Sequence, residues 1–238
     1  MKTKAILFDK DGTLIDFDSV WVTVSSYAIS YILKEINMPQ IPKIELLECL
    51  GIYDGTASID GVLAQYPYDI MSEHINKVLC KHGCSIDSGR LCEITQKAYI
   101  DNLDKGIVKL ACQDEYAVLD LLRSKGIMLF VVTNDYYNAA LGTLDKAGIS
   151  DCFDGIYSPD QNYKHKPDRQ MIDALLNKYN LKNNEVVMVG DTLADMEFAI
   201  NGNIKGIGVA KNERNRNILL TKTNTVIKDI SELVSIID

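Results

Sequence analysis

The sequence contains no apolar stretch long enough to cross a membrane, and its basic residues are fewer than its acidic ones. The apolar run nearest the N-terminus, residues 5–8, is far shorter than the core of a signal peptide or a membrane span. Lys and Arg number 25 against 33 Asp and Glu, which gives a formal net charge of −8. Binding to nucleic acid needs clustered basic residues that displace counterions, and an anionic membrane surface attracts the same residues. We therefore expect a cytoplasmic protein with no nucleic-acid partner and no membrane partner.

The cysteines show neither a disulfide framework nor a strong metal-binding pattern. All six lie at irregular intervals, and in a chain with no export signal we expect them to be reduced and mostly buried. Cys80 and Cys84, with Cys92 nearby, could in principle bind zinc, but their spacing is loose and the segment looks helical, so we expect no metal there. With 238 residues, 47% hydrophobic and 24% charged, the chain is long enough for a core domain that carries a smaller one.

Short apolar runs that end in polar turns predict the strands of a buried parallel sheet. The clearest runs are residues 4–8, 127–133 and 185–190, and weaker strands are expected near residues 155–157, 204–209 and 225–227. Apolar residues recur at helical spacing between these strands, as at Leu119 and Leu122 before Gly126. From about residue 106 onward helix and strand alternate, which is typical of a parallel sheet covered by helices on both faces.

Residues 17–105 break this alternation. They contain helical patterns, such as residues 20–36 and 70–82, and no convincing strand. The simplest interpretation is a helical domain inserted after the first strand. We therefore predict an α/β core domain made of residues 1–16 and 106–238, and a helical domain made of residues 17–105.

The first candidate motif, Asp9-Lys10-Asp11-Gly12-Thr13, follows the first strand directly. Open α/β sheets place their ligand sites at the carboxyl ends of strands, where these two carboxylates lie. Gly12 permits a tight turn whose backbone N–H groups can face an anion. An acidic surface turn would look the same, because Asp-Gly is a common turn dipeptide.

Two further motifs are weak when taken alone. Thr133-Asn134 ends the strongest strand, where a hydroxyl and an amide can donate to a phosphate oxygen or simply cap a helix. Lys166-Pro167 precedes the helix expected near Asp168, where proline is structurally ordinary and lysine is usually a surface residue.

The fourth motif, Gly190-Asp191-Thr192-Leu193-Ala194-Asp195, again follows a strand. If a helix begins there, Asp191 and Asp195 lie near one of its faces, although either acid could serve only to stabilise the helix N-terminus. A parallel sheet would gather Asp9, Asp11 and these two acids at one edge, where they cannot all ionise cheaply unless a cation joins them. A few carboxylate oxygens with room for water and phosphate suit Mg²⁺.

The order of the four motifs resembles that of the haloacid dehalogenase-like (HAD) hydrolase superfamily, and within it the phosphoglycolate phosphatase and β-phosphoglucomutase branch. The resemblance spans the whole core, and the insertion after the first motif resembles the helical cap of that family. It implies a Rossmann-like parallel sheet core with an inserted α-helical cap domain. It also implies a Mg²⁺-dependent phosphatase that acts on a small phosphorylated metabolite.

The same resemblance implies a role for each matching residue. Asp9 would attack phosphorus to form an aspartyl-phosphate, and Asp11 would act as general acid and then as general base. Lys166 would join them as a catalytic residue that balances charge on the phosphoryl group. The phosphate-binding residues would be Gly12, Thr133, the backbone of Asn134, and Lys166. The metal ligands would be Asp9, the backbone carbonyl of Asp11, and Asp191, with Asp195 supporting them.

Several alternatives stay open. A sugar phosphomutase shares the acid–base aspartate and the cap, and nothing in one sequence separates it from a phosphatase. Dehalogenases and phosphonate-cleaving relatives are disfavoured because Asp11, Asp191 and Asp195 are all present. Outside the enzymes, a receiver-like phospho-acceptor domain or a catalytically silent binding protein is possible. The complete motif set and the insertion argue against both. The chain could be a monomer or a homodimer.

Two departures from the resemblance involve no residue of the expected chemistry. Asp135 follows Thr-Asn where relatives often carry a basic residue, and residues 110–113 replace a frequent Pro-Gly entry to the next helix. Residues 17–105 hold 12 acidic and 7 basic side chains, a net charge of −5, which disfavours a strongly anionic leaving group.

Overall fold

The structure, a computed structural model, describes residues 2–237. Its backbone contacts divide the chain into two compact units. One unit runs to Asp16 and resumes at Val108, and the other spans Phe17–Ile107. The second junction therefore lies two residues after the boundary expected at residue 105.

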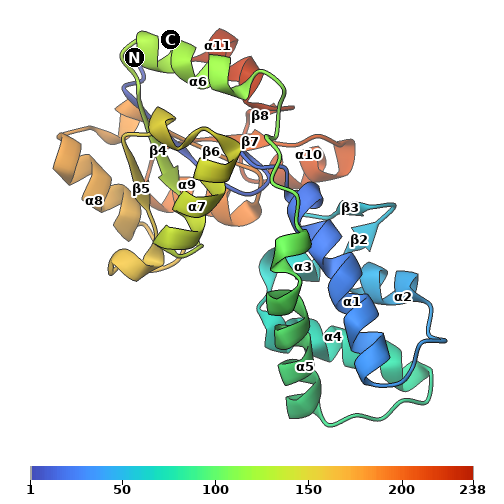
Figure 1. The fold of residues 1–238 in the computed structure, drawn as a ribbon. Helices are drawn as coiled ribbons and strands as arrows, with labels where there is room; N and C mark the ends of the chain where they lie inside the picture. The colour runs from blue at the N-terminus through green and yellow to red at the C-terminus, as the bar shows by residue number, and fades with distance from the viewer. Residues whose placement is uncertain (1, 238) are drawn as a thin grey trace. The chain divides into compact units, whose positions relative to one another are not determined.

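The first unit is built on a six-stranded parallel sheet with the strand order β5-β4-β1-β6-β7-β8 (Figure 1). The strands are β1 (Ala5–Phe8), β4 (Met128–Val132), β5 (Gly155–Tyr157), β6 (Val186–Gly190), β7 (Lys205–Val209) and β8 (Val226–Ile227). The predicted α/β fold is thus confirmed. β1 lies at the centre of the sheet, and all four of its residues are fully buried. This burial explains why its sequence is continuously apolar rather than alternating.

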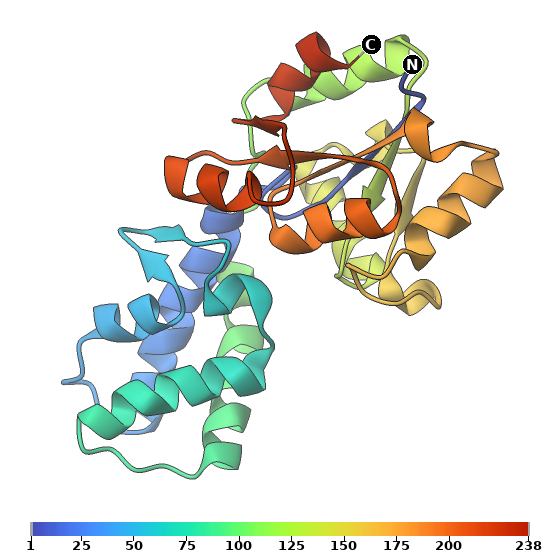
Figure 2. The ribbon, with the colours of Figure 1, turned by 180° about the vertical axis from the view of Figure 1, so that it is seen from behind.

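Helices cover the sheet on both faces, as Figures 1 and 2 show from opposite sides. They are α6 (Glu115–Ser124), α7 (Tyr137–Ala147), α8 (Gln170–Tyr179), α9 (Leu193–Asn201), α10 (Glu213–Leu219) and α11 (Leu233–Ile236). Leu7, Phe130 and Met188 share one face of the sheet, because side chains alternate along a strand. They pack with Met171 of α8 and Phe198 of α9 in one fully buried cluster.

The second unit is mainly helical. Its helices are η1 (Asp18–Val22, a π-helix), α1 (Thr23–Glu35), α2 (Lys43–Cys49), α3 (Val62–Gln65), α4 (Tyr68–Lys81), α5 (Ser88–Asp101) and η2 (Leu103–Lys105, 3-10). Ile29 and Ile32 of α1 and Ile75 of α4 lie in its core, where Tyr99 of α5 donates a hydrogen bond to the hydroxyl of Ser25 over 2.8 Å. The helix predicted over residues 20–36 is therefore a π-helical turn followed by α1.

The expectation that residues 17–105 contain no strand is wrong. β2 (Ile52–Tyr53) and β3 (Thr56–Ala57) form a small antiparallel hairpin. Asp54 and Gly55 form its turn with φ of 50° and 77°, and Asp-Gly is a preferred pair for such two-residue turns. Each strand has only two residues, too few for an alternating pattern to stand out.

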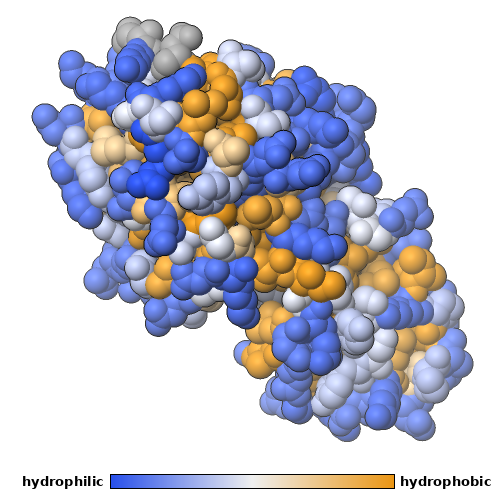
Figure 3. Space-filling view, turned by 45° about the horizontal axis from the view of Figure 1, so that its top comes forward, coloured by the Kyte–Doolittle hydropathy of each residue, from blue (hydrophilic) through white to orange (hydrophobic). Residues whose placement is uncertain are grey.

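The surface is mostly polar. On the face drawn in Figure 3, hydrophilic residues predominate and hydrophobic residues form smaller patches between them, as expected for an acidic globular protein. Within residues 2–237, no helix combines the length and the apolar character that a membrane span requires.

Candidate active site

The carboxyl ends of β1, β4 and β6 bring three of the four motifs together. Phe8, the last residue of β1, is paired with Val131 of β4 and with Val189 of β6. Asp9 therefore emerges between the two neighbouring strands, close to where Asp191 leaves β6. The strand order β4-β1-β6, which the sequence does not reveal, is the physical reason why these distant motifs meet.

Three buried carboxylates form the centre of the site. Asp9, Asp191 and Asp195 each offer an oxygen, and these oxygens lie within 4.8 Å of one another. The pKa of Asp9 is raised to about 7, mainly by burial and also by the charges of Asp195 and Asp11, while the charge of Lys166 and its hydrogen bond lower it. Burial also raises the pKa of Asp191 well above its ordinary value, and the charges of Asp9 and Asp195 add to the effect. Such a cluster of oxygen ligands fits a hard dication such as Mg²⁺, which would relieve their repulsion.

Lys166 is the cation of this cluster. Its ammonium donates to Asp9 Oδ1 over 2.5 Å and to Asp195 Oδ1 over 2.6 Å. Burial lowers the pKa of Lys166, but the two carboxylates more than offset this and raise it above its ordinary value. The lysine is only 7% exposed, so it is not the surface residue that its sequence context also allowed.

Asn134 anchors the loop that carries Lys166. Its side-chain oxygen accepts a hydrogen bond from the backbone N–H of Lys166 over 2.7 Å, and its amide donates to the Lys166 carbonyl over 3.3 Å. The side chain of Asn134 thus joins the second motif to the third. This leaves only its backbone for the phosphate contact expected from the sequence.

Asp195 is held from two sides. Its Oδ2 accepts from the backbone N–H of Thr192 over 3.0 Å and from the Thr192 hydroxyl over 2.6 Å, while Oδ1 accepts from Lys166. Thr192 caps α9, which begins at Leu193, so Asp191 precedes the helix instead of sharing a face with Asp195. Gly190 is required at this point, because a Cβ there would lie 2.4 Å from Asp195 Cβ.

Gly12 and Thr13 fix the position of Asp191. Gly12 has φ of +86°, and a Cβ on it would lie 2.0 Å from Asp191 Oδ2. Thr13 is fully buried, and its hydroxyl donates to Asp191 Oδ1 over 3.3 Å. Thr13 was not predicted as a site residue, and only its place in the motif could have suggested it.

Asp11 lies apart from the three clustered carboxylates. Its Oδ2 accepts a hydrogen bond from Lys10 over 2.6 Å, and the same ammonium lies 3.0 Å from Asp135 Oδ2. Burial raises the pKa of Asp11, and the charge of Lys10 opposes this effect. Asp135 was expected from the sequence to play no part in the chemistry. It shares the Lys10 ammonium with Asp11. Its backbone N–H donates to Thr133 Oγ1 over 3.1 Å, so the proton of the Thr133 hydroxyl remains available to another acceptor.

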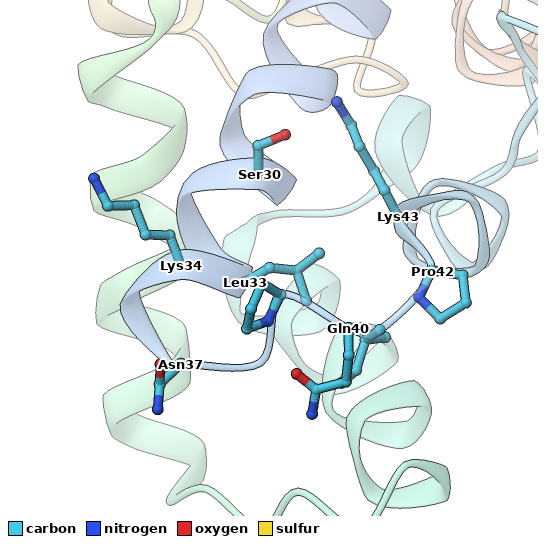
Figure 4. A pocket seen from close by; sticks show the side chains of 9 residues that line it. Ser30, Leu33, Lys34, Asn37, Gln40, Pro42 and Lys43 are labelled. Atoms are coloured by element: carbon cyan, nitrogen blue, oxygen red, sulfur yellow. The ribbon is translucent and has the colours of Figure 1, made fainter.

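A second concave region lies in the helical unit and has none of these features. Residues around the α1–α2 connection line it, including Lys34 and Lys43 (Figure 4). The Lys43 ammonium already donates a hydrogen bond to the hydroxyl of Ser26 over 2.6 Å. Among the described residues that line this region none is a carboxylate, so it lacks the buried acids of the sheet edge, which is the candidate active site.

Comparison with known proteins points to one family. A sequence model of the haloacid dehalogenase-like hydrolase family matches residues 6–209. The phosphoglycolate phosphatase of Nitrosospira multiformis is 26% identical over 196 residues, which cover 82% of this chain and 78% of that protein. Pyrophosphatase PpaX of Oceanobacillus iheyensis is 24% identical over 240 residues, covering 100% and 98% of the two chains. A solved structure, described as a predicted phosphoglycolate phosphatase from Haemophilus somnus, aligns with a TM-score of 0.74 at 20% identity, covering 99% and 98%.

Proposed function

Because this chain belongs to the haloacid dehalogenase-like hydrolase family, we propose that it is a Mg²⁺-dependent phosphatase that uses Asp9 as its nucleophile. The observation that carries the proposal is the buried cluster around Asp9, in which two further carboxylates and Lys166 meet at the ends of β1 and β6. A structural cluster of this kind would be costly to bury without a charged ligand to complete it.

The reaction would proceed in two displacements on phosphorus. A carboxylate oxygen of Asp9 attacks phosphorus, and the bond between phosphorus and the leaving oxygen breaks as an aspartyl-phosphate forms. Asp11 gives its proton to the leaving oxygen. In the second step Asp11 takes a proton from a water molecule, whose oxygen attacks phosphorus, and phosphate leaves as the Asp9 carboxylate is restored.

The residues around the nucleophile would position the phosphoryl group and balance its charge. An ammonium has three N–H donors, and Lys166 uses two of them on Asp9 and Asp195, so one remains for a phosphoryl oxygen. The hydroxyl of Thr133 and the backbone N–H groups of Gly12 and Asn134 would supply the other donors. Positioning and charge neutralisation are most of what phosphoryl transfer requires from a protein.

The acids of the cluster also fit the proposed metal ion. The carboxylates of Asp9 and Asp191 and the carbonyl of Asp11 would hold Mg²⁺, and Asp195 would support them through Lys166 and Thr192. When bound, the ion would neutralise charge on the phosphoryl oxygens. Its donors are all oxygens, which suits a hard cation.

The names of the relatives suggest the substrate class. We propose a small phosphomonoester or related phosphate compound, because the two relatives are named for phosphoglycolate and pyrophosphate. The unit Phe17–Ile107 would serve as the cap domain that selects among such substrates.

The test is release of phosphate from 4-nitrophenyl phosphate in the presence of Mg²⁺. Activity should be lost in Asp9→Asn and in excess chelator. Asp173→Asn should retain activity, because that aspartate pairs with Arg169 in a solvent-exposed ion pair at the start of α8. Unchanged turnover in Asp9→Asn, or full activity in chelator, would refute the mechanism. Incubation with glucose 1-phosphate separates a mutase from a phosphatase, since a mutase forms an isomer rather than free phosphate.

A further inference from the structure

Lys10 is a buried lysine held between two carboxylates at the edge of the active site. Its ammonium lies 2.6 Å from Asp11 Oδ2 and 3.0 Å from Asp135 Oδ2. The Lys10 side chain is 3% exposed, whereas those of Asp11 and Asp135 are 19% and 36% exposed. A buried ammonium without partners is strongly unfavourable, so the position of Lys10 depends on both acids.

Asp135 is the fixed end of this arrangement. It follows β4 by three residues, and its backbone N–H donates to Thr133 Oγ1 over 3.1 Å. The backbone N–H of Thr133 in turn donates to the carbonyl of Tyr157, the last residue of β5, over 3.1 Å, so the Asp135 carboxylate projects from a loop that is tied to the end of the sheet. Asp11, which follows β1, contacts the same ammonium. We call the contacts Asp11–Lys10–Asp135 the bridge; it connects the turns that follow two neighbouring strands, β1 and β4.

The bridge accounts for where the Asp11 carboxylate lies. The oxygens of Asp9, Asp191 and Asp195 gather within 4.8 Å, and the group that the described residues form there does not include Asp11. We propose that Lys10 and Asp135 act as positioning residues, which hold the Asp11 carboxyl away from the metal-binding carboxylates and free for the leaving oxygen. This inference rests on the proposed function, in which Asp11 exchanges protons with the leaving group and with water.

The experiment compares Lys10→Met, Lys10→Arg, Asp135→Asn and the double variant Lys10→Met/Asp135→Asn on two aryl phosphates. Phenolate is a more basic leaving group than 4-nitrophenolate, so hydrolysis of phenyl phosphate depends more on a well-placed acid. A misplaced catalytic group costs up to about 100-fold, so we expect kcat for phenyl phosphate to fall about 10- to 100-fold in Lys10→Met with KM unchanged. The loss should be smaller for 4-nitrophenyl phosphate.

The other variants test the connection between the two residues. Lys10→Arg, which can keep both ion pairs, should recover part of the lost kcat. The double variant should be no slower than Lys10→Met, because Asp135 acts only through the lysine. Lys222→Met, which removes a surface pair with Glu197 at 3.1 Å, is the matched control and should behave as wild type. Thermal unfolding of each variant shows whether a loss of activity is a loss of folded protein.

The outcomes separate this inference from the proposed function. Equal losses on the two esters, a change in KM alone, or an additive double variant would overturn the bridge while leaving the phosphatase in place. If the wild-type protein hydrolyses neither ester, the proposed function fails. Crystal structures of wild type and Lys10→Met then decide the bridge: an unmoved Asp11 carboxyl overturns it, and one that turns toward Asp191 supports it.

Discussion

Glu115 is a buried acid whose titration should make the stability of the protein depend on pH. It is the first residue of α6 and is fully buried. Its Oε2 accepts from the backbone N–H groups of Ala111 and Cys112 over 3.1 and 3.3 Å. In the described part of the chain its Oε1 has no hydrogen-bond partner. A charged carboxylate is poorly solvated in such a place, whereas the neutral acid is tolerated more easily.

The sign of the effect follows from the direction of the shift. Burial raises the pKa of Glu115 from 4.5 to about 8, although the N–H groups of Cys112 and Ala111 and the charge of Lys211 lower it. Between these values the unfolded chain carries a carboxylate while the folded protein keeps its proton. The stabilising contribution is therefore complete below pH 4.5 and is lost as the pH rises toward 8. At about 1.4 kcal/mol per pH unit the upper limit is about 5 kcal/mol. Because relaxation and water entry reduce such penalties, we expect about 1–3 kcal/mol.

The assay is urea unfolding of wild type and Glu115→Gln at several pH values from 5 to 9, with reductant present because the cysteines are free. Glutamine cannot ionise. The free energy of unfolding of Glu115→Gln should therefore fall less than that of the wild-type protein as the pH rises. Glu213→Gln is the matched control, because Glu213 is also the first residue of a helix, α10, but is exposed. If the free energies of unfolding of wild type and Glu115→Gln change with pH in parallel across this range, the reasoning is refuted, even if the two proteins differ in stability by a constant amount.

Two further substitutions test the residues that shape the proposed metal site. Gly12→Ala should reduce Mg²⁺-dependent activity about 100-fold, because the added Cβ would lie 2.0 Å from Asp191 Oδ2. Titration of this variant with Mg²⁺ should show weaker binding than in wild type. Kinetics equal to those of wild type would contradict the role of Gly12. Thr192→Val should lower the free energy of unfolding by about 1 kcal/mol, because α9 loses its side-chain cap. It should also slow turnover by freeing Asp195, whereas Thr192→Ser, which keeps the hydroxyl, should show neither effect.

The alternation of helix and strand was sufficient to predict the core. The residues of β1, β4 and β6 are continuously apolar because they are buried on both faces, and this pattern is visible in the sequence. The order of the strands was not visible, since it depends on which neighbours pair across the sheet. The hairpin around Asp54 was missed because its strands are shorter than any periodic pattern can reveal.

The motifs predict the acids of the candidate site but not the residues that hold them in place. Asp9, Asp191 and Asp195 meet as the predicted parallel sheet requires. Lys10 was passed over, because a lysine between two acids after a strand is usually solvated, and only the tertiary structure buries it. Asp135 was noted as a departure from the family pattern. Asp135 is connected to Asp11 through Lys10, by a contact between two loops that the spacing of residues in the sequence does not predict.

The hydrogen bonds also distinguish acids that look equivalent in the sequence. Both oxygens of Asp195 already accept hydrogen bonds, Oδ1 from Lys166 and Oδ2 from Thr192. In the described part of the chain Asp191 accepts the longer contact from the Thr13 hydroxyl at 3.3 Å and a hydrogen bond from its own backbone N–H, and no ammonium donates to it. Its Oδ2 lies close to Gly12, in the space that a side chain at that position would fill. A carboxylate oxygen that is already engaged by an ammonium is a poorer ligand for a cation than one that is not. The geometry therefore favours Asp191 as the direct ligand of the proposed metal ion, and Asp195 as the residue that holds Lys166 against Asp9, the proposed nucleophile.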